Sequence, residues 1–262
     1  LYSRFWQKVL FDAGMVSHPE PFQKLFHQGL ILGPDGEKMS KSRGNVMSPD
    51  DLVEKFGADV FRTYEMEMGT FEEAIPWSMD MLNGTFKFIT RIQKLLEKYD
   101  SKQMPAASIE SLMHKTIKKV GDDIEKLKFN TALAAIRILV NDITSLPTIS
   151  KQDFENLLKI LCPFAPHICE ELWHAIGNTD SIVLSAWPIY DEKKTIDSTV
   201  QLAVQVNGKL RDVLEVSADI TETDAFFLAL ASEKVKKYAT PENIVKKIFV
   251  KGKMVSLVVK NV

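Results

Sequence analysis

Apolar residues recur at a spacing of three and four through the middle of the chain, which predicts a series of amphipathic helices. The expected helices cover 78–98, 109–126, 130–145, 151–162 and 166–176. Ser150 followed by Asp153 is typical of an N-terminal capping pair, and Phe164 and Trp173 lie at core spacing. Because the connections between the segments are short, we expect an up-and-down helical bundle.

The pattern is less regular before the bundle. Residues 2–13 predict a helix closed by Gly14, and residues 21–28 predict a second, short helix. Residues 29–33 are expected to form a short buried strand or a turn.

Another helix start is marked by three residues within 48–51. Ser48 is expected at the N-cap, Pro49 at the first helical position and Asp51 three residues after the cap. Gly57 should end this helix, and residues 58–68 begin the next.

The last quarter of the chain changes to strict alternation. Residues 199–216 alternate around Asn207-Gly208, which is the strongest short-range signal for a β-hairpin. A helix is expected near 221–238, and residues 244–260 read as a second hairpin. The sequence therefore predicts a small ββ-α-ββ module, preceded by a polar linker within 186–198.

Composition narrows the class of protein. The chain has 262 residues, 45% of them hydrophobic, and a net charge of −2, which argues against general coating of nucleic acid. No apolar run approaches a membrane span or a signal peptide. Cys162 and Cys169 are too far apart along a helix for a disulfide, so a reducing cytoplasm is expected. The first residue lies inside an amphipathic helix, which suggests a fragment or subunit of a longer protein.

One stretch has a composition that no regular element requires. Residues 36–45 read GEKMSKSRGN, with three cations in six residues that repel one another unless an anion lies among them. Gly36 and Gly44 flank the loop and are expected either to let it close and reopen or only to form turns. No Walker GxxxxGK[ST] motif is present, so phosphate would be bound by side chains. The alternative interpretation is a solvated surface loop.

This loop resembles the signature of a known family. KMSKS at 38–42, followed by RGNV and by GAD at 57–59, is similar to the signature loop of class I aminoacyl-tRNA synthetases. CPFAPHICEELW at 162–173 resembles the helical domain of the leucine, isoleucine and valine enzymes. The leucine enzymes of bacterial type are favoured by YEMEMG at 64–69, PWS at 76–78, VQVNGKLRD at 204–212 and IFVKGKMVSLVV at 248–259.

The resemblance implies a mainly α fold that corresponds to the C-terminal portion of such an enzyme. Residues 1–77 would be the end of the class I catalytic domain, 78–185 a helical-bundle domain of the anticodon-binding type, and 186–262 an α+β tRNA-binding domain. The HIGH tetrapeptide of the class is absent from the sequence. We therefore expect the chain alone to be inactive, with the N-terminal half as a partner, either covalently joined or as a separate subunit.

The implied reaction is ligation of leucine to tRNA(Leu) using ATP, with Mg as the counter-ion of ATP. By match to the motif, Lys41 is the main cation for the β- and γ-phosphates and Lys38 a second one. Ser40 and Ser42 would bind phosphate or hold the loop, and Met39 would pack it against the body. Two alternatives stay open: an isoleucine or valine enzyme, and a non-catalytic module that binds tRNA or protein.

Residues outside 38–42 have other expected roles. Asn45 is expected in a turn and Asp59 at a helix cap. His167, Cys169 and His174 match no metal-binding spacing, so no metal site is expected. From 199 to 262, ten Lys and Arg face seven Asp and Glu, a local balance of +3. Phosphate contacts to tRNA are expected among Arg91, Lys94, Lys118, Lys119, Lys236, Lys237, Lys246, Lys247 and Lys251.

Overall fold

The computed structural model describes residues 1–195 and 199–260. Residues 196–198, which belong to the predicted linker, and residues 261–262 lie outside these ranges. The chain divides into two compact units, the first comprising 1–109 and 116–189 and the second 110–115 and 190–262. The division of the sequence into three domains stays a prediction.

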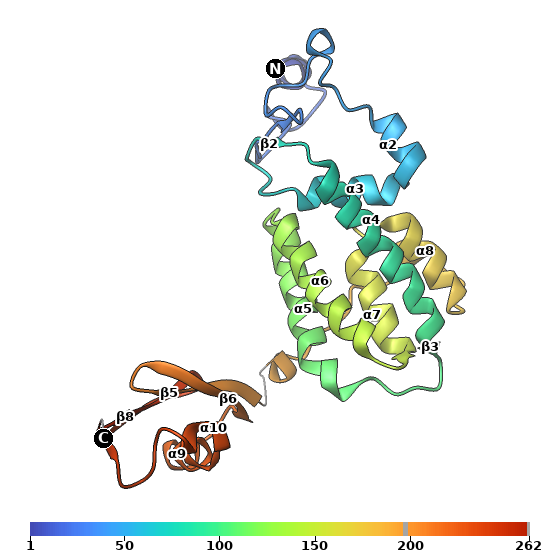
Figure 1. Ribbon diagram of the computed structural model, residues 1–262. Coiled ribbons are helices and arrows are strands. Elements are labelled where there is room, and N and C mark those ends of the chain that lie inside the picture. The colour runs from blue at the N-terminus through green and yellow to red at the C-terminus, as the bar shows by residue number, and fades with distance from the viewer. Residues whose placement is uncertain (196–198, 261–262) are drawn as a thin grey trace. The chain divides into compact units, whose positions relative to one another are not determined.

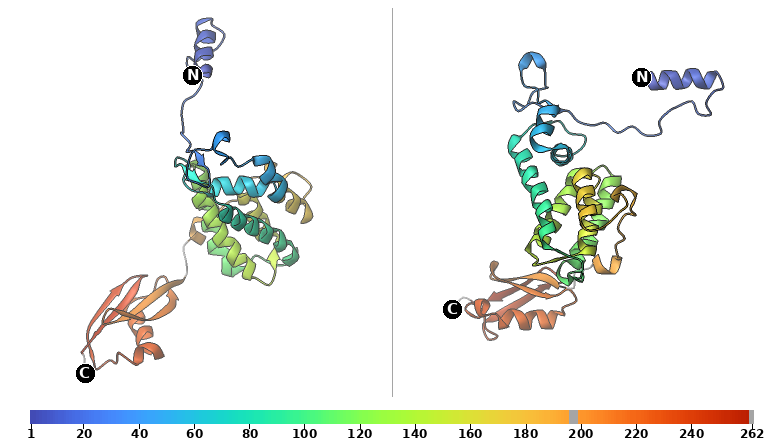
Figure 2. Two further views of the ribbon diagram at one scale, coloured as in Figure 1. Left: turned by 45° about the horizontal axis from the view of Figure 1, so that its top comes forward. Right: turned by 90° about the vertical axis from the view of Figure 1, so that its right-hand side faces the viewer.

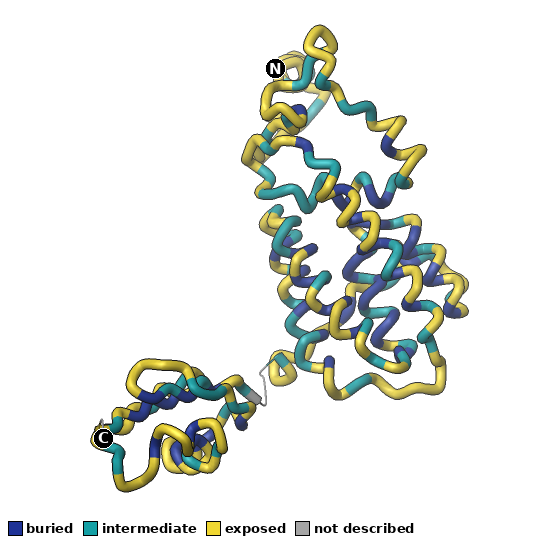
Figure 3. The backbone as a smooth tube through the Cα atoms, viewed as in Figure 1, coloured by how far each residue is buried: buried dark blue, intermediate teal, exposed yellow. Residues whose placement is uncertain are grey.

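The first unit is built around the predicted helices (Figure 1). They are α4 (Met79–Lys94), extended by one 3₁₀ turn to Lys98, and α5 (Ala107–Glu125), α6 (Phe129–Ser145), α7 (Lys151–Leu161) and α8 (Pro166–Ala175). Both views in Figure 2 show these helices side by side. The bundle prediction is confirmed, and Phe164 and Trp173 are buried as expected. Figure 3 shows the buried residues running along the helices of the bundle.

The predicted caps form in part. The Ser150 hydroxyl accepts from the Asp153 N–H at 3.0 Å at the start of α7. Ser48 is the N-cap of α2 (Pro49–Phe56), with Pro49 first in the helix, but its side chain makes no capping bond. The Asp59 carboxylate, at the start of α3 (Ala58–Glu67), caps a different helix, because it accepts from the Ile168 N–H of α8 at 2.7 Å. Capping thereby joins α3 to the bundle.

A half-buried ion pair also joins α3 to the bundle, at the C-terminal end of α3. The Arg137 guanidinium of α6 donates from Nη2 to Glu67 Oε2 at 2.6 Å and lies 4.2 Å from the Phe88 ring centroid of α4. The Thr85 hydroxyl of α4 also donates to Glu67, at 3.0 Å. One carboxylate thus links three helices, so the segment that follows the candidate loop is fixed to the bundle.

The N-terminal segment differs from the prediction in two places. Helix α1 (Tyr2–Asp12) forms, but no helix forms over 21–28. Phe22, Leu25 and Phe26 stay exposed there, and a helix this short is marginal without tertiary packing. The segment predicted as a short buried strand or a turn forms the strand β1 (Ile31–Leu32), which pairs in parallel with β2 (Ile75–Pro76), but Ile31 is 37% exposed, so only the predicted burial was wrong.

The second unit confirms the ββ-α-ββ module. Its strands are β5 (Thr199–Val206), β6 (Lys209–Ser217), β7 (Ile244–Val250) and β8 (Met254–Val259), in the sheet order β6-β5-β8-β7 with β5 and β8 parallel. Asn207 and Gly208 both take positive φ in the first hairpin. The helix expected over 221–238 is interrupted at Ser232, giving α9 (Glu222–Ala231) and α10 (Glu233–Lys236).

No helix within the described residues combines the length and apolar character that a membrane span requires. Two short strands, β3 (Tyr99–Asp100) and β4 (Ile149–Ser150), pair in parallel beside the bundle.

A candidate phosphate-binding loop

The candidate loop starts as a small hairpin. The Gly33 N–H donates to the Glu37 carbonyl at 2.8 Å, and Leu32 and Lys38 form an antiparallel bridge. Gly36 takes a φ of +76° in the turn, a conformation in which glycine carries no steric cost. The hairpin brings Asp35 back toward the end of the loop at Asn45.

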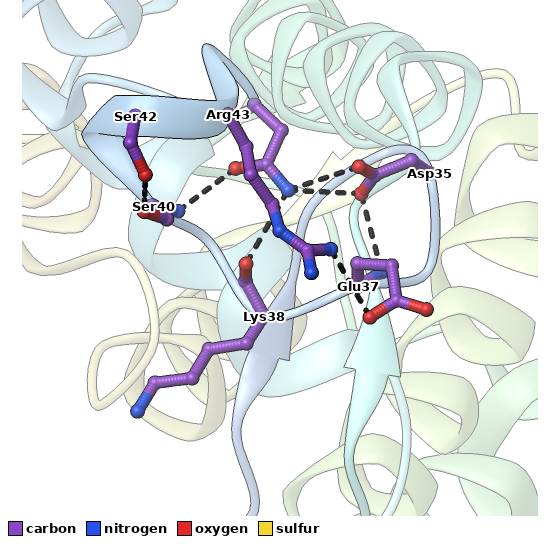
Figure 4. A network of polar contacts seen from close by, with 7 residues as sticks. Asp35, Glu37, Lys38, Ser40, Ser42 and Arg43 are labelled. Atoms are coloured by element: carbon purple, nitrogen blue, oxygen red, sulfur yellow. Dashed lines mark hydrogen bonds and ion pairs between the residues drawn. The ribbon is translucent and has the colours of Figure 1, made fainter.

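Asn45 connects three parts of the loop, those that contain the residues labelled Asp35, Lys38 and Ser40 in Figure 4. Its Oδ1 accepts from the Ser40 N–H at 2.8 Å, and its Nδ2 donates to both Asp35 oxygens at 3.0 Å. The Lys38 carbonyl lies 3.4 Å from the same Nδ2. The hydrogen bond from the Asn45 amide, together with that from the Glu37 N–H, lowers the pKa of the Asp35 carboxyl from its ordinary value.

The three cations of the loop have different surroundings. The Arg43 guanidinium donates to the Glu37 carboxylate at 3.2 Å. The ammonium groups of Lys38 and Lys41 make no ion pair or hydrogen bond among the described residues, and both residues are exposed. Lys41 begins a single 3₁₀ turn, Lys41–Arg43, which Gly44 ends in the left-handed conformation. The hairpin and turn therefore present two unneutralised cations, while the third is neutralised within the loop.

The hydroxyls predicted to meet phosphate lie beside these cations. Ser40 Oγ and Ser42 Oγ are 2.8 Å apart and share one hydrogen bond. The shared bond leaves acceptor and donor capacity on both oxygens. Met39 is half-buried, and its role in packing the loop stays a prediction.

Sequence reasoning missed Asp35 and Glu37 as members of this site and treated Asn45 as a turn residue. A signal was present, because two acidic residues, Asp35 and Glu37, come directly before the three cations in so short a stretch. The hairpin at Gly33–Glu37 determines that Asp35 contacts Asn45 and that Glu37 contacts Arg43. The sequence pattern alone does not specify the backbone conformation of this hairpin.

The basic residues proposed for tRNA differ in their present partners. In the first unit, Lys119 pairs with Asp123 at 2.7 Å and Lys118 with Asp122 at 3.9 Å, whereas Lys94 is exposed. Arg91 is half-buried, 6.0 Å from the Phe88 ring centroid.

Some of the basic residues of the second unit form ion pairs and others do not. Lys236 pairs with Glu233 at 2.6 Å and Lys251 with Asp219 at 4.0 Å. Lys247 lies 5.5 Å from the Phe226 ring centroid. Lys237 and Lys246 are exposed and form no direct ion pair with a described residue.

The two histidines of α8 have hydrogen-bond partners within the protein. His167 Nδ1 is 2.7 Å from Asp59 Oδ1, and His174 Nδ1 is 2.8 Å from the Asn178 carbonyl oxygen. Both thiols are free, and burial raises the pKa of Cys162 and, more strongly, of Cys169. Within 1–195 and 199–260, no group of three or more His, Cys, Asp or Glu could hold a metal ion.

Comparison with known proteins identifies related families over most of the chain. Residues 2–78 match the family described as tRNA synthetases class I (I, L, M and V), and residues 106–226 match the anticodon-binding domain of tRNA ligase. The leucine--tRNA ligase of Leptospira biflexa serovar Patoc is 48% identical over 99% of this chain, and that of Alkaliphilus oremlandii is 46% identical over 99%. The chain belongs to the leucyl-tRNA synthetase family. This result favours the leucine enzymes over the isoleucine and valine alternatives.

A solved leucyl-tRNA synthetase has a similar fold. The crystal structure of the ternary complex of Agrobacterium radiobacter K84 agnB2 LeuRS with tRNA and LeuAMS has a TM-score of 0.69 and 30% identity, covering 99% of this chain and 36% of that one. The chain spans about a third of the length of its leucyl-tRNA synthetase relatives, 31% of the Leptospira biflexa protein and 32% of the Alkaliphilus oremlandii protein.

Proposed function

We propose that this chain supplies the phosphate-binding loop and part of the tRNA-docking surface of an enzyme that ligates leucine to tRNA(Leu) using ATP. The observation that carries the proposal is the contrast between Arg43, neutralised by Glu37, and the exposed, unpaired ammonium groups of Lys38 and Lys41. Exposed like charges on one loop repel each other, and a polyphosphate relieves that repulsion.

The chemistry assigns these two lysines a role in the transition state. When leucine is activated by ATP, negative charge develops on the departing pyrophosphate, and catalysis consists mainly of positioning and charge stabilisation. Lys41 would meet the β- and γ-phosphates, with Lys38 as the second cation. Ser40 and Ser42 would donate hydrogen bonds to the same oxygens.

Magnesium fits this loop only as the counter-ion of ATP. The Asp35 carboxylate accepts from Asn45 and the Glu37 carboxylate pairs with Arg43, so the acidic side chains of the loop are already engaged. When bound, Mg²⁺ would neutralise part of the phosphate charge, while the loop itself contributes cations and hydroxyls.

The remainder of the enzyme would complete the site. The class motif HIGH is absent from this sequence, so leucine recognition and the rest of the nucleotide site would come from the N-terminal half, covalently joined or as a separate subunit. The two free cysteines are consistent with work in the cytoplasm, where thiols stay reduced.

Replacing Lys41 tests the proposal. In a complete synthetase that contains this chain, Lys41→Ala should lower the leucine-dependent ATP–pyrophosphate exchange rate about a hundredfold, because a charge-assisted contact to the transition state is worth about 3 kcal/mol. The affinity for leucine should change little. The exposed Lys102→Ala, outside the loop, is the control and should match the wild type. Equal losses in exchange rate and leucine affinity would contradict the assigned role.

Docking of tRNA is a second part of the proposal, and the exposed lysines that lack an ion pair are the best candidates. Changing Lys94, Lys237 and Lys246 together to Gln should weaken binding of this chain to tRNA(Leu). It should also reduce the slope of log affinity against log salt by about 0.7–0.9 for each phosphate that is no longer neutralised. A control with the same net charge, Lys8, Lys102 and Lys194 to Gln, should keep the wild-type slope. Identical slopes for the two triple variants would refute this docking surface.

A further inference from the structure

The amide of Asn45 holds the backbone between the two catalytic lysine candidates, Lys38 and Lys41. The Ser40 N–H that it accepts lies directly before Lys41, and the Lys38 carbonyl lies 3.4 Å from its Nδ2. An amide side chain combines an acceptor and two donors, so one residue can bind both the Ser40 N–H and the Lys38 carbonyl. The segment 38–45 is thereby closed into a ring by a single side chain.

Asp35 fixes that amide from the other side. Both of its oxygens accept from Asn45 Nδ2 at 3.0 Å, and Oδ1 also accepts from the Glu37 N–H at 3.1 Å. These hydrogen bonds hold the Asp35 carboxylate against Asn45 and the Glu37 backbone, and among the described residues it forms no ion pair with a lysine of the loop. The lowered pKa of Asp35 agrees with a carboxylate that stays ionised in this setting.

Gly33 makes the approach possible. A Cβ at this position would lie 2.7 Å from Asp35 Oδ1 and 2.8 Å from Asn45 Nδ2, closer than real Cβ contacts. A larger residue here would therefore have to displace the Asp35–Asn45 pair, which packs against the Gly33 backbone.

We propose that Asp35 and Asn45 are positioning residues, which hold Lys38 and Lys41 at the spacing that a polyphosphate requires. The identity of the ligand rests on the proposed function, whereas the hold on the loop can be measured without it. Neither residue needs to touch ATP, because Asn45 acts through the backbone of Lys38 and Ser40, and Asp35 acts through the Asn45 amide.

Exchanging the two side chains gives a sharp test. Asn45→Asp keeps the acceptor for Ser40 but removes the donors and places two carboxylates in contact. The double variant Asp35→Asn with Asn45→Asp restores one amide and one carboxylate with the polarity reversed. The amide at 35 can then donate to the carboxylate at 45, which still accepts from the Ser40 N–H, and only the 3.4 Å contact with the Lys38 carbonyl stays lost. Asn83→Asp adds the same charge at an exposed position on α4 and is the control.

Two readouts on the chain itself separate the inference from the proposed function. Backbone ¹⁵N relaxation of residues 38–45 reports loop order, and titration with inorganic tripolyphosphate reports anion binding. Asn45→Asp should lower the order parameters and weaken tripolyphosphate binding about tenfold, because a hydrogen-bonded charged pair is removed. The double variant should recover both, to within about threefold in affinity, and the control should resemble the wild type.

The outcomes are distinct. Unchanged order parameters in Asn45→Asp, or a double variant no better than the single one, would overturn the positioning role. Loss and recovery of loop order as described would support the hold on the loop. If the ordered wild-type loop then failed to bind tripolyphosphate, the proposed phosphate-binding function would be refuted instead.

Discussion

At the scale of single residues, Asp212 joins strand β6 to the break between α9 and α10. Its Oδ2 accepts from Ser232 Oγ at 2.6 Å, and its Oδ1 accepts from Lys234 Nζ at 2.9 Å. These hydrogen bonds, from Ser232 first and then Lys234, lower the pKa of Asp212 to about 2. The contacts also explain why the helix expected over 221–238 is interrupted, since the Ser232 side chain is directed to the sheet.

This carboxylate should make the second unit sensitive to acid. The folded pKa of about 2 lies below the ordinary value of 3.8, so the stabilisation is present above pH 4 and is lost as the pH falls toward 2. Asp212→Asn should lower the unfolding midpoint at pH 7 and remove that part of the pH dependence. Heating the chain at pH 2–7 while following NMR signals of β5 and β6 measures both effects.

The matched control is Asp219→Asn, whose side chain is 99% exposed and 4.0 Å from Lys251. An exposed pair of this kind contributes little, so its curve should follow the wild type. An Asp212→Asn curve that runs parallel to the wild type between pH 2 and pH 4 would contradict the role of Asp212.

Residue-scale prediction from the sequence succeeded where local spacing was sufficient. The Ser150–Asp153 cap and the positive φ of Asn207 and Gly208 follow from short motifs. The partners of Asp59 and Asp35 did not follow, because they depend on contacts with α8 and on the exact fold of the loop. The assignment of Lys38 and Lys41 came from the motif and stays a prediction.

At the scale of elements, periodicity found the helices with buried faces. Helices α4 to α8 and the hairpin of β5 and β6 lie close to their predicted positions, because each buries apolar residues at a regular spacing. The segment 21–28 has apolar residues too, but nothing within the described residues covers Phe22, Leu25 or Phe26, and no helix forms. Local propensity without burial was therefore insufficient.

Some contacts between elements could not be predicted from sequence patterns. Strands β1 with β2 and β3 with β4 contain two residues each, too few to show alternation, and both pairs are parallel and distant in sequence. The Glu67–Arg137 ion pair joins helices 70 residues apart. Such contacts depend on how the bundle packs. The Glu67–Arg137 pair fixes α3, which follows the candidate loop in the sequence, to the bundle.

At the scale of the whole molecule, a helical bundle and a small mixed sheet form separate compact units on one chain. The motifs that predicted the family are spread over both units, from the loop at 38–45 to the tail at 248–259. Agreement over 99% of the chain with leucyl-tRNA synthetases confirms that prediction. The central claim that follows is that this loop works inside a larger active site.

Leucine-dependent ATP–pyrophosphate exchange tests that claim most directly. The chain would be assayed alone and mixed with the part of the Leptospira biflexa relative that it does not span, with a Lys41→Ala mixture as the control. We predict no exchange by the chain alone, exchange in the wild-type mixture, and about a hundredfold less exchange in the Lys41→Ala mixture. Equal exchange in both mixtures, or none in the wild-type mixture despite association of the two parts, would contradict the account.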